Sequence, residues 1–296
     1  MKTTNQLEII EFTDPVCTWC WASEPVLRAL KERYGDQMET SFVMGGLVKD
    51  IRNFDDDGIG GDPSASNKQI AQHWLEASEQ HGMPVTTATL ELFSAEHPSS
   101  YPQNIAYKAA QFEDGALADA FLRRIREATA VEAKQTNREE VLLLLAKGVG
   151  LDIKKLLTHL NDGTAQAAFE TDLATTKAYK VTLLPTFIIR YKGKEIVLEN
   201  YQKVEDFGQA IQTLSHNELI SKVPKASPEV ILHFIKTYGR VAPIEIMMAF
   251  NVRKDKAMEW VHALEQDKLV SVQNAGNGIF IQCSQLKLST PKFSRI

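Results

Sequence analysis

The sequence has 296 residues, 44% hydrophobic and 24% charged, so it is long enough to bury a large core and too apolar for wholesale disorder. Its formal net charge of −5 argues against a protein coated in nucleic acid. No run of about 18 apolar residues predicts a membrane span, and the start of the chain lacks the pattern of a secretory signal. Three cysteines are too few for a secreted disulfide scaffold, so a cytoplasmic protein is favoured.

Charge is unevenly distributed along the chain. Residues 222–296 carry 11 Lys and Arg against 6 Asp and Glu, whereas residues 1–221 carry 22 against 32. The opposite signs predict two surfaces with different partners. We therefore expect two domains, residues 1–221 and residues 222–296, with the second beginning at Lys222-Val-Pro224.

The first elements predicted along the chain are a strand, a helix and a second strand. Residues 7–12 form a short apolar run of β-forming residues, typical of a buried strand. Residues 18–34 have apolar side chains at helical spacing and end at Gly35, although Pro25 predicts a kink. Residues 38–44 have the pattern of a second strand, which a right-handed crossover would place parallel to the first.

A long helical segment follows at about residues 64–179, after a loop rich in Gly and Asp. Its apolar spacing predicts helices at 66–81, 87–93, 102–113, 117–130, 138–147, 153–161 and 164–179. Strand character then returns at 186–191 and 195–198, joined by a hairpin turn, before a closing helix at 205–214. The order predicts an α/β fold, a thioredoxin-type sheet interrupted by an inserted all-helical domain.

The last segment has the layout of a small winged helix-turn-helix domain. Helices are predicted at 228–238, 243–250 and 253–267, followed by strands at 269–273 and 278–283. The third helix begins with the basic residues Arg253 and Lys254, which suit phosphate contacts, but it also carries Glu259, Glu265 and Asp267. We therefore expect this domain to contact a protein partner or a second copy of the chain, with DNA the less favoured partner.

The sequence Cys17-Thr18-Trp19-Cys20 lies at a predicted strand-to-helix junction. Its spacing places two sulfur atoms on one helical turn, close enough to form a disulfide. Cys17 falls at the N-terminus of the helix, where unpaired N–H groups and the macrodipole stabilise a thiolate. Because the thiolate is the attacking species in thiol–disulfide exchange, Cys17 is the predicted nucleophile and Cys20 the resolving cysteine.

Two other interpretations of the cysteine pair stay open, half of a zinc site and a pair of inert core thiols. Zinc needs four ligands, and neither Cys283 nor the seven histidines form a second spaced set. We therefore expect no metal and no organic cofactor. Cys283 itself has the pattern of a small packed residue on the last strand.

Four short motifs are informative together. They are IEFTDPVCTWCW at residues 10–21, MGGL at 44–47, SSYP at 99–102 and LPTF at 184–187. In this order they resemble DsbA-like proteins of the thioredoxin superfamily, including the predicted protein-disulfide isomerase and FrnE-like branch, over about residues 7–215. The resemblance implies a thioredoxin fold with an inserted helical domain, and disulfide exchange between the two through Cys17 and Cys20.

The resemblance also assigns expected roles to residues outside the cysteine pair. Pro185 matches a cis-proline, and its neighbours Leu184 and Thr186 would contact an extended peptide substrate. Glu11 matches a buried carboxylate that helps to move protons near the second cysteine. A surface position on the strand is the alternative for Glu11.

Trp19 marks a departure from DsbA, which has a histidine immediately before the resolving cysteine. Trp19 adds no positive charge, and no Lys, Arg or His occurs between Glu11 and Arg28. We therefore expect a pair less oxidising than that of DsbA, with a potential of roughly −180 to −270 mV. Trp19 is expected to be exposed and to offer substrates a flat apolar contact, whereas Trp21 would pack the helix onto the insertion.

Three functions are consistent with these patterns. The leading prediction is a cytoplasmic disulfide reductase or isomerase, an enzyme that acts on protein or small-molecule disulfides. An alternative is a non-enzymatic adaptor on the same fold, because some cytoplasmic relatives deliver substrates to a protease and do not need the cysteines. A redox-responsive DNA-binding protein that uses its last domain is the third.

Overall fold

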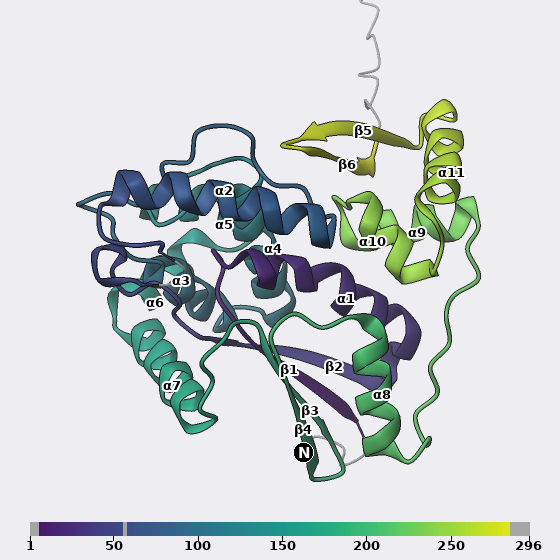
Figure 1. The fold of residues 1–296 in the computed structure, drawn as a ribbon, viewed down its shortest axis with the longest axis horizontal. Helices are drawn as coiled ribbons and strands as arrows, with labels where there is room; N and C mark the ends of the chain where they lie inside the picture. The colour runs from purple at the N-terminus through teal and green to yellow at the C-terminus, as the bar shows by residue number, and fades with distance from the viewer. Residues whose placement is uncertain (1–5, 56–57, 285–296) are drawn as a thin grey trace, which may run out of the picture.

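The computed structural model describes residues 6–55 and 58–284, and its centre is a four-stranded sheet in the order β2-β1-β3-β4 (Figure 1). The strands and the two helices that accompany them are β1 (Leu7–Thr13), α1 (Thr18–Tyr34), β2 (Met38–Met44), β3 (Thr186–Tyr191), β4 (Lys194–Glu199) and α8 (Val204–Ser215). β1 and β2 are parallel, whereas β3 runs antiparallel to both β1 and β4. The predicted β-α-β and β-β-α units are therefore both present.

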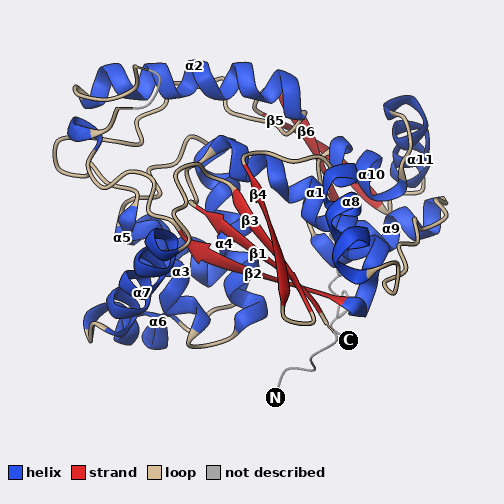
Figure 2. Cartoon of the chain, turned by 60° about the horizontal axis from the view of Figure 1, so that its bottom comes forward, coloured by secondary structure: helices blue, strands red, loops and turns tan. Residues whose placement is uncertain are grey.

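One hydrophobic core joins the sheet to α1 and α8. Leu7 and Ile9 of β1 are fully buried in it, as are Phe187 and Ile189 of β3. Alternate residues of a strand point to the same face, so these side chains meet the helices together. Figure 2 shows the strands lying between the helices of the insertion on one side and the C-terminal elements on the other.

Among the described residues, six α-helices lie between β2 and β3 and form the inserted helical region. They are α2 (Pro63–His81), α3 (Tyr101–Gln111), α4 (Gly115–Ala130), α5 (Glu139–Val149), α6 (Ile153–Asn161) and α7 (Thr164–Ala178). Phe121 and Ile125 of α4 are fully buried in a second core with Tyr107 of α3 and Phe169 of α7. Because each helix buries an apolar face, apolar residues recur at helical spacing in the sequence. That spacing is why the positions of these helices could be predicted.

The predicted helix at residues 87–93 is wrong, because this segment forms an irregular loop. The side-chain amide of Asn67 donates to the Phe93 carbonyl at 2.8 Å, and its oxygen accepts from the Phe93 amide at 3.0 Å. The Thr86 amide similarly donates to the Ala130 carbonyl at 2.6 Å. Bonds to distant elements thus take the place of the local bonds that a helix would make.

The C-terminal region, as far as residue 284, contains three helices and a two-stranded antiparallel hairpin, in the order expected from the sequence. Its elements are α9 (Pro228–Tyr238), α10 (Pro243–Phe250), α11 (Lys254–Gln266), β5 (Val270–Ala275) and β6 (Gly278–Cys283). A single antiparallel bridge joins Val241 to Ile281 of β6. Ile231, Phe250 and Val261 of the three helices share a buried core with β5 and β6.

The C-terminal region packs against α1 and against the loop after α2, among other contacts. α10 lies along α1, and the β5–β6 turn contacts the loop after α2. There the Asn277 amide donates to the Val85 carbonyl at 2.9 Å, and the Val85 amide donates to the Asn277 side chain at 2.9 Å. Across the described ranges, no helix is both long and apolar enough to cross a membrane.

Candidate functional site

Cys17 lies at the start of α1, where it is the residue that caps the helix. Its amide donates to the Asp14 carbonyl at 3.2 Å, which holds the turn between β1 and α1. Its thiol donates to the Leu184 carbonyl at 3.5 Å, and the Leu184–Pro185 peptide bond is cis. Two segments 167 residues apart in the sequence therefore meet at this sulfur, and Cys17 as a whole is 8% exposed.

Cys20 lies one helical turn further along α1 and is fully buried. Both thiols of the pair are free. Burial raises the pKa of Cys20 well above its usual range, and its contact with Cys17 adds to the rise. The Cys20 thiol is therefore neutral at pH 7 in the reduced protein, and a base must take its proton before it can attack a disulfide.

Glu11 of β1 is the candidate for this base. It is fully buried, and burial raises its pKa to about 7, with the charge of Arg126 opposing the rise. One carboxylate oxygen accepts from the Thr13 hydroxyl at 3.1 Å, while the other has no hydrogen-bond partner among the described residues. Electrostatic interaction between Glu11 and Cys20 contributes to the raised pKa of Cys20. A carboxyl group with a pKa near 7 can both accept and release a proton at neutral pH.

Arg126 of α4 also lies at this site, although no pattern in the sequence indicates it. It is fully buried, its side chain donates to the Thr13 hydroxyl, and its guanidinium lies 3.6 Å from the Glu11 carboxylate. It also pairs with Glu24 of α1 at 2.5 Å. The site therefore has a local cation, supplied by the insertion, although none occurs in the sequence between Glu11 and Arg28. The charge of Arg126 lowers the pKa of both Glu11 and Cys20, against the effect of burial.

Asp14 is a second residue of the site that the sequence patterns do not indicate. It is fully buried, and burial raises its pKa. Its carboxylate accepts from the amides of Val16 and Leu47 at 3.0 and 2.8 Å, and from the side chains of Ser100 and Asn104 at 3.0 and 2.8 Å. Asp14 thereby joins the turn before Cys17 to the loop after β2 and to α3. Two of the motifs behind the family resemblance, at 44–47 and 99–102, meet at this carboxylate.

The remaining predicted site residues surround the pair. Trp19 is half-buried, because its ring lies 5.9 Å from that of His81 and 5.8 Å from that of Tyr201. Burial lowers the pKa of His81 to about 4, so this neighbour is neutral at pH 7. Thr186 is 2% exposed, and its hydroxyl donates to the Leu183 carbonyl at 2.8 Å. Contacts of Thr186, Leu184 and Trp19 with a substrate remain predictions.

Trp21 connects the site to both neighbouring regions. Its indole N–H donates to the Pro84 carbonyl at 2.9 Å, and its ring packs edge-on against Phe280 of β6 at 6.5 Å. The guanidinium of Arg123 lies 4.4 Å from the centre of the Trp21 ring. The helix that carries the cysteine pair is therefore fixed to the insertion and to the C-terminal hairpin by one side chain.

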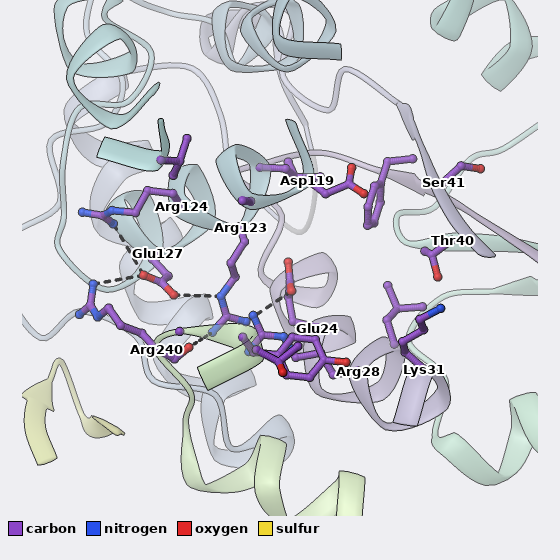
Figure 3. Close-up of a pocket in the computed structure, with 18 of the residues that line it drawn as sticks. Glu24, Arg28, Lys31, Thr40, Ser41, Asp119, Arg123, Arg124, Glu127 and Arg240 are labelled. Carbon is purple, nitrogen blue, oxygen red and sulfur yellow. Dashed lines mark hydrogen bonds and ion pairs between the residues drawn. The ribbon is translucent and has the colours of Figure 1, made fainter. Parts of the chain in front are cut away.

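A chain of ion pairs leads from the cysteine site to the C-terminal region, and Figure 3 shows the part of it that joins Glu24, Arg123, Glu127 and Arg240. Glu24 pairs with Arg126 and, at 3.4 Å, with Arg123 of α4. Arg123 also pairs with Glu245 of α10 at 3.0 Å, and Glu245 pairs with Arg28 of α1 at 2.6 Å. All five side chains are at least about nine-tenths buried. This network holds α1, α4 and α10 in a fixed arrangement.

Comparisons with known proteins agree with this architecture. A family model described as thioredoxin matches residues 11–209, about two-thirds of the chain, so the chain belongs to the thioredoxin family. The fold is DsbA-like. The structure of a candidate protein disulfide isomerase from Nitrosomonas europaea superposes with a TM-score of 0.60 at 17% identity, covering 72% of this chain and 99% of that one. The cytosolic disulfide reductase DsbM from Pseudomonas aeruginosa superposes with a TM-score of 0.53 at 24% identity, covering 65% and 89%.

One similar protein is described as an adapter and not as an oxidoreductase. The ClpXP adapter protein SpxH of Halalkalibacterium halodurans is 30% identical over 259 residues, which are 86% of this chain and 82% of that protein. Because this alignment covers 86% of the chain, it continues well past residue 209, where the thioredoxin match ends. The similarity thus includes part of the C-terminal region.

Proposed function

We propose that the chain is an adaptor that binds a protein and brings it to a ClpXP-type protease. The observation that carries the proposal is the extent of the similarity to the adapter protein, which includes residues of both the thioredoxin-like region and the C-terminal region. The similarity to the disulfide reductase covers only 65% of the chain. An adaptor needs two binding surfaces, and the opposite charges of the two segments are consistent with that need.

The C-terminal region is the surface that we propose for one of these protein contacts. Its three helices, hairpin and bridge support our proposal that it is a winged-helix-like domain that serves here for protein binding. The basic residues at the start of α11 are partly neutralised, because Arg253 pairs with Asp255 and Lys256 pairs with Glu259 at 2.7 Å. This pairing favours a protein partner over the phosphates of DNA.

Protein half-lives in the source organism test the adaptor proposal. Pulse-labelled proteomes would be compared between the wild type, a strain without this chain and a strain without ClpX. We expect a small set of proteins to be stabilised in both deletion strains, and re-expression of the chain to restore their turnover. Unchanged half-lives in the strain without this chain would rule out delivery to the protease.

Thiol–disulfide exchange is a second candidate function, favoured by the arrangement of Cys17, Cys20 and Glu11. The Cys17 thiolate would attack a substrate disulfide, forming a mixed disulfide and releasing one substrate thiolate. Glu11 would then accept the Cys20 proton, and the Cys20 thiolate would attack the Cys17 sulfur and release the second substrate thiolate. The substrate gains two electrons and the pair is oxidised, so a thiol such as glutathione must reduce it again.

The redox potential of the purified protein tests this second function. Equilibration with defined ratios of reduced and oxidised glutathione, followed by counting of free thiols, gives the potential of the pair directly. We expect roughly −180 to −270 mV, the range of reductases and isomerases. A value near −120 mV would instead favour a disulfide donor, and a pair that never oxidises would rule out exchange.

A further inference from the structure

Gly45, in the loop that follows β2, lies directly against Leu184. A Cβ atom at Gly45 would lie 2.9 and 3.0 Å from the two methyl carbons of Leu184, and 3.4 Å from the Thr13 carbonyl oxygen. Carbon atoms in van der Waals contact are about 3.5–4.0 Å apart. Gly45 does not have a left-handed backbone, so this position requires glycine because of the close approach alone.

Hydrogen bonds hold Gly45 beside the turn that presents Cys17. The Gly45 amide donates to the Thr13 carbonyl at 2.7 Å, and the Leu47 amide donates to the Asp14 carboxylate at 2.8 Å. The Asp14 carbonyl in turn accepts from the Cys17 amide at 3.2 Å. The loop after β2 is thus bonded to the cysteine turn, and a displacement of Gly45 would break its bond to β1.

Leu184 connects this loop to the nucleophile. Its side chain lies against Gly45, and its carbonyl accepts from the Cys17 thiol at 3.5 Å. The two methyl groups occupy two of the three staggered positions about the last side-chain bond, so every staggered rotation leaves at least one methyl group against residue 45. A side chain at residue 45 could therefore be accommodated only by movement closer to the main chain of Leu184, which carries this carbonyl.

We propose that Gly45 is a positioning residue of the cysteine site, because its lack of a side chain lets Leu184 seat against the loop after β2 and so sets the distance from the Leu184 carbonyl to the Cys17 sulfur. A carbonyl oxygen accepts a hydrogen bond from a thiol but repels a thiolate, so this contact favours the protonated form of Cys17. Gly45 thereby restrains the thiolate that the helix N-terminus favours. The consequence for turnover rests on the proposed exchange function, whereas the contact itself can be measured in the reduced protein.

The titratable groups around the cysteine pair lie outside the two segments that meet at this contact. They are Asp14, Cys20, Glu11, Arg126, His81 and Tyr201. Residues 44–47 and 183–186 contain no titratable side chain. Replacement of Gly45 by alanine therefore changes no charge near Cys17, and an altered dependence of Cys17 reactivity on pH would report the position of the Leu184 carbonyl.

Alkylation of Cys17 in the reduced protein gives a direct test. The rate of its reaction with iodoacetamide would be measured by mass spectrometry over a range of pH and expressed relative to the alkaline plateau, so that differences in access to the sulfur cancel. Gly45→Ala is the test variant. Gly208→Ala is the matched control, because Gly208 lies in α8 with open space where a Cβ atom would be and without a left-handed backbone.

The variants would be compared at the pH where Cys17 of the wild type reacts well below its plateau rate. We expect the relative rate of Gly45→Ala to be about three- to tenfold higher there, through loss of one hydrogen bond to the protonated thiol, and Gly208→Ala to match the wild type. An unchanged or slower relative rate in Gly45→Ala would overturn the proposal, even if that variant is less stable, because lower stability without a change at Cys17 means a structural role alone.

Leu184→Ala tests the same contact from its other side, and gives a reading should Gly45→Ala fail to fold. It removes both methyl groups from the contact, so the carbonyl loses its seat and the relative rate of Cys17 alkylation should also rise. In the Leu184→Ala background, Gly45→Ala should have no further effect. A wild-type pH profile in Leu184→Ala, or a full effect of Gly45→Ala in its background, would contradict the proposal.

Turnover of oxidised glutathione by the same proteins separates this inference from the exchange function. A wild-type protein without turnover, whose Gly45→Ala variant still shows the faster alkylation, would rule out exchange with this disulfide and support the positioning role. Turnover by the wild type with an unchanged alkylation profile in Gly45→Ala would support exchange and overturn the positioning role.

Discussion

Cys17 and Cys20 differ in exposure and in surroundings, and this difference predicts distinct results for their serine variants. Cys17→Ser should abolish disulfide exchange, because the nucleophile at the helix start is lost. Cys20→Ser should accumulate a long-lived mixed disulfide through Cys17, visible as a shifted band on a non-reducing gel with a disulfide substrate. Cys283→Ser is the matched control and should behave as the wild type, since Cys283 lies on β6. A trapped species in Cys17→Ser, with none in Cys20→Ser, would reverse the roles.

Glu11 predicts a specific dependence of stability on pH. Its pKa is about 7 in the folded protein and 4.5 as a model group, so the folded state binds this proton more tightly. The resulting stabilisation is complete below pH 4.5 and is lost as the pH rises through 7. Relative to Glu11→Gln, which cannot titrate, the free energy of unfolding of the wild type should fall by about 3 kcal/mol across that window.

Urea unfolding at a series of pH values, with the thiols kept reduced, would measure this difference. Comparison with the glutamine variant isolates Glu11 from His81, whose lowered pKa gives the opposite trend as the pH falls below 6.5. A constant difference between the two proteins from pH 4.5 to pH 7.5 would show that Glu11 ionises normally.

At the scale of elements, the β5–β6 turn predicts how strongly the C-terminal region depends on its contact with the loop after α2. Gly276 has φ +54°, and a Cβ atom there would lie 1.8 Å from the Val85 carbonyl oxygen. Gly193, in the β3–β4 turn, has φ +75° and open space around it. Gly193→Ala should therefore cost only the backbone strain of about 1 kcal/mol, whereas Gly276→Ala should cost about 3 kcal/mol.

Thermal or urea unfolding of the two alanine variants checks this expectation. Both substitutions impose a similar backbone strain, so the difference in the free energy of unfolding between them reports the steric contact with Val85 alone. Equal values for the two variants would mean that the hairpin moves away from the loop at little cost.

The elements were largely predictable from local patterns, and the failures have a common physical cause. Apolar spacing and glycine stops locate α1, β1 and β2 because these features act through neighbouring residues. Residues 87–93 have the same helical spacing, yet Asn67 holds the Phe93 backbone in a loop. A bond to a side chain 26 residues away leaves no trace in the local pattern.

Contacts between distant residues were likewise not predictable at the candidate site around Cys17 and Cys20. Cys17 and Cys20 could be found from their spacing, while Glu11 and Pro185 came from the family resemblance. Arg126 could not be found in this way, because it reaches the site from a helix more than 100 residues along the chain. Arg126 is one of three arginines in α4, beside Arg123 and Arg124, so no local pattern singles it out as the charge partner of Glu11.

At the scale of the whole molecule, the cysteine pair and the C-terminal region belong to one connected structure. Trp21 contacts both Pro84 and Phe280, and the pairs of Arg123 with Glu24 and Glu245 join α4 to α1 and α10. A protein-binding function can therefore use surfaces from several regions without relative movement between them.

The most direct test of the adaptor proposal is reconstituted degradation. A protein whose half-life depends on this chain in cells would be incubated with purified ClpXP and ATP, with and without the chain, and its disappearance followed on gels. The account predicts that the wild type and the double variant Cys17→Ser/Cys20→Ser both accelerate degradation of this protein, while a protein with an unaffected half-life is degraded at its basal rate. If the wild-type chain does not accelerate degradation of this protein, the adaptor function is contradicted.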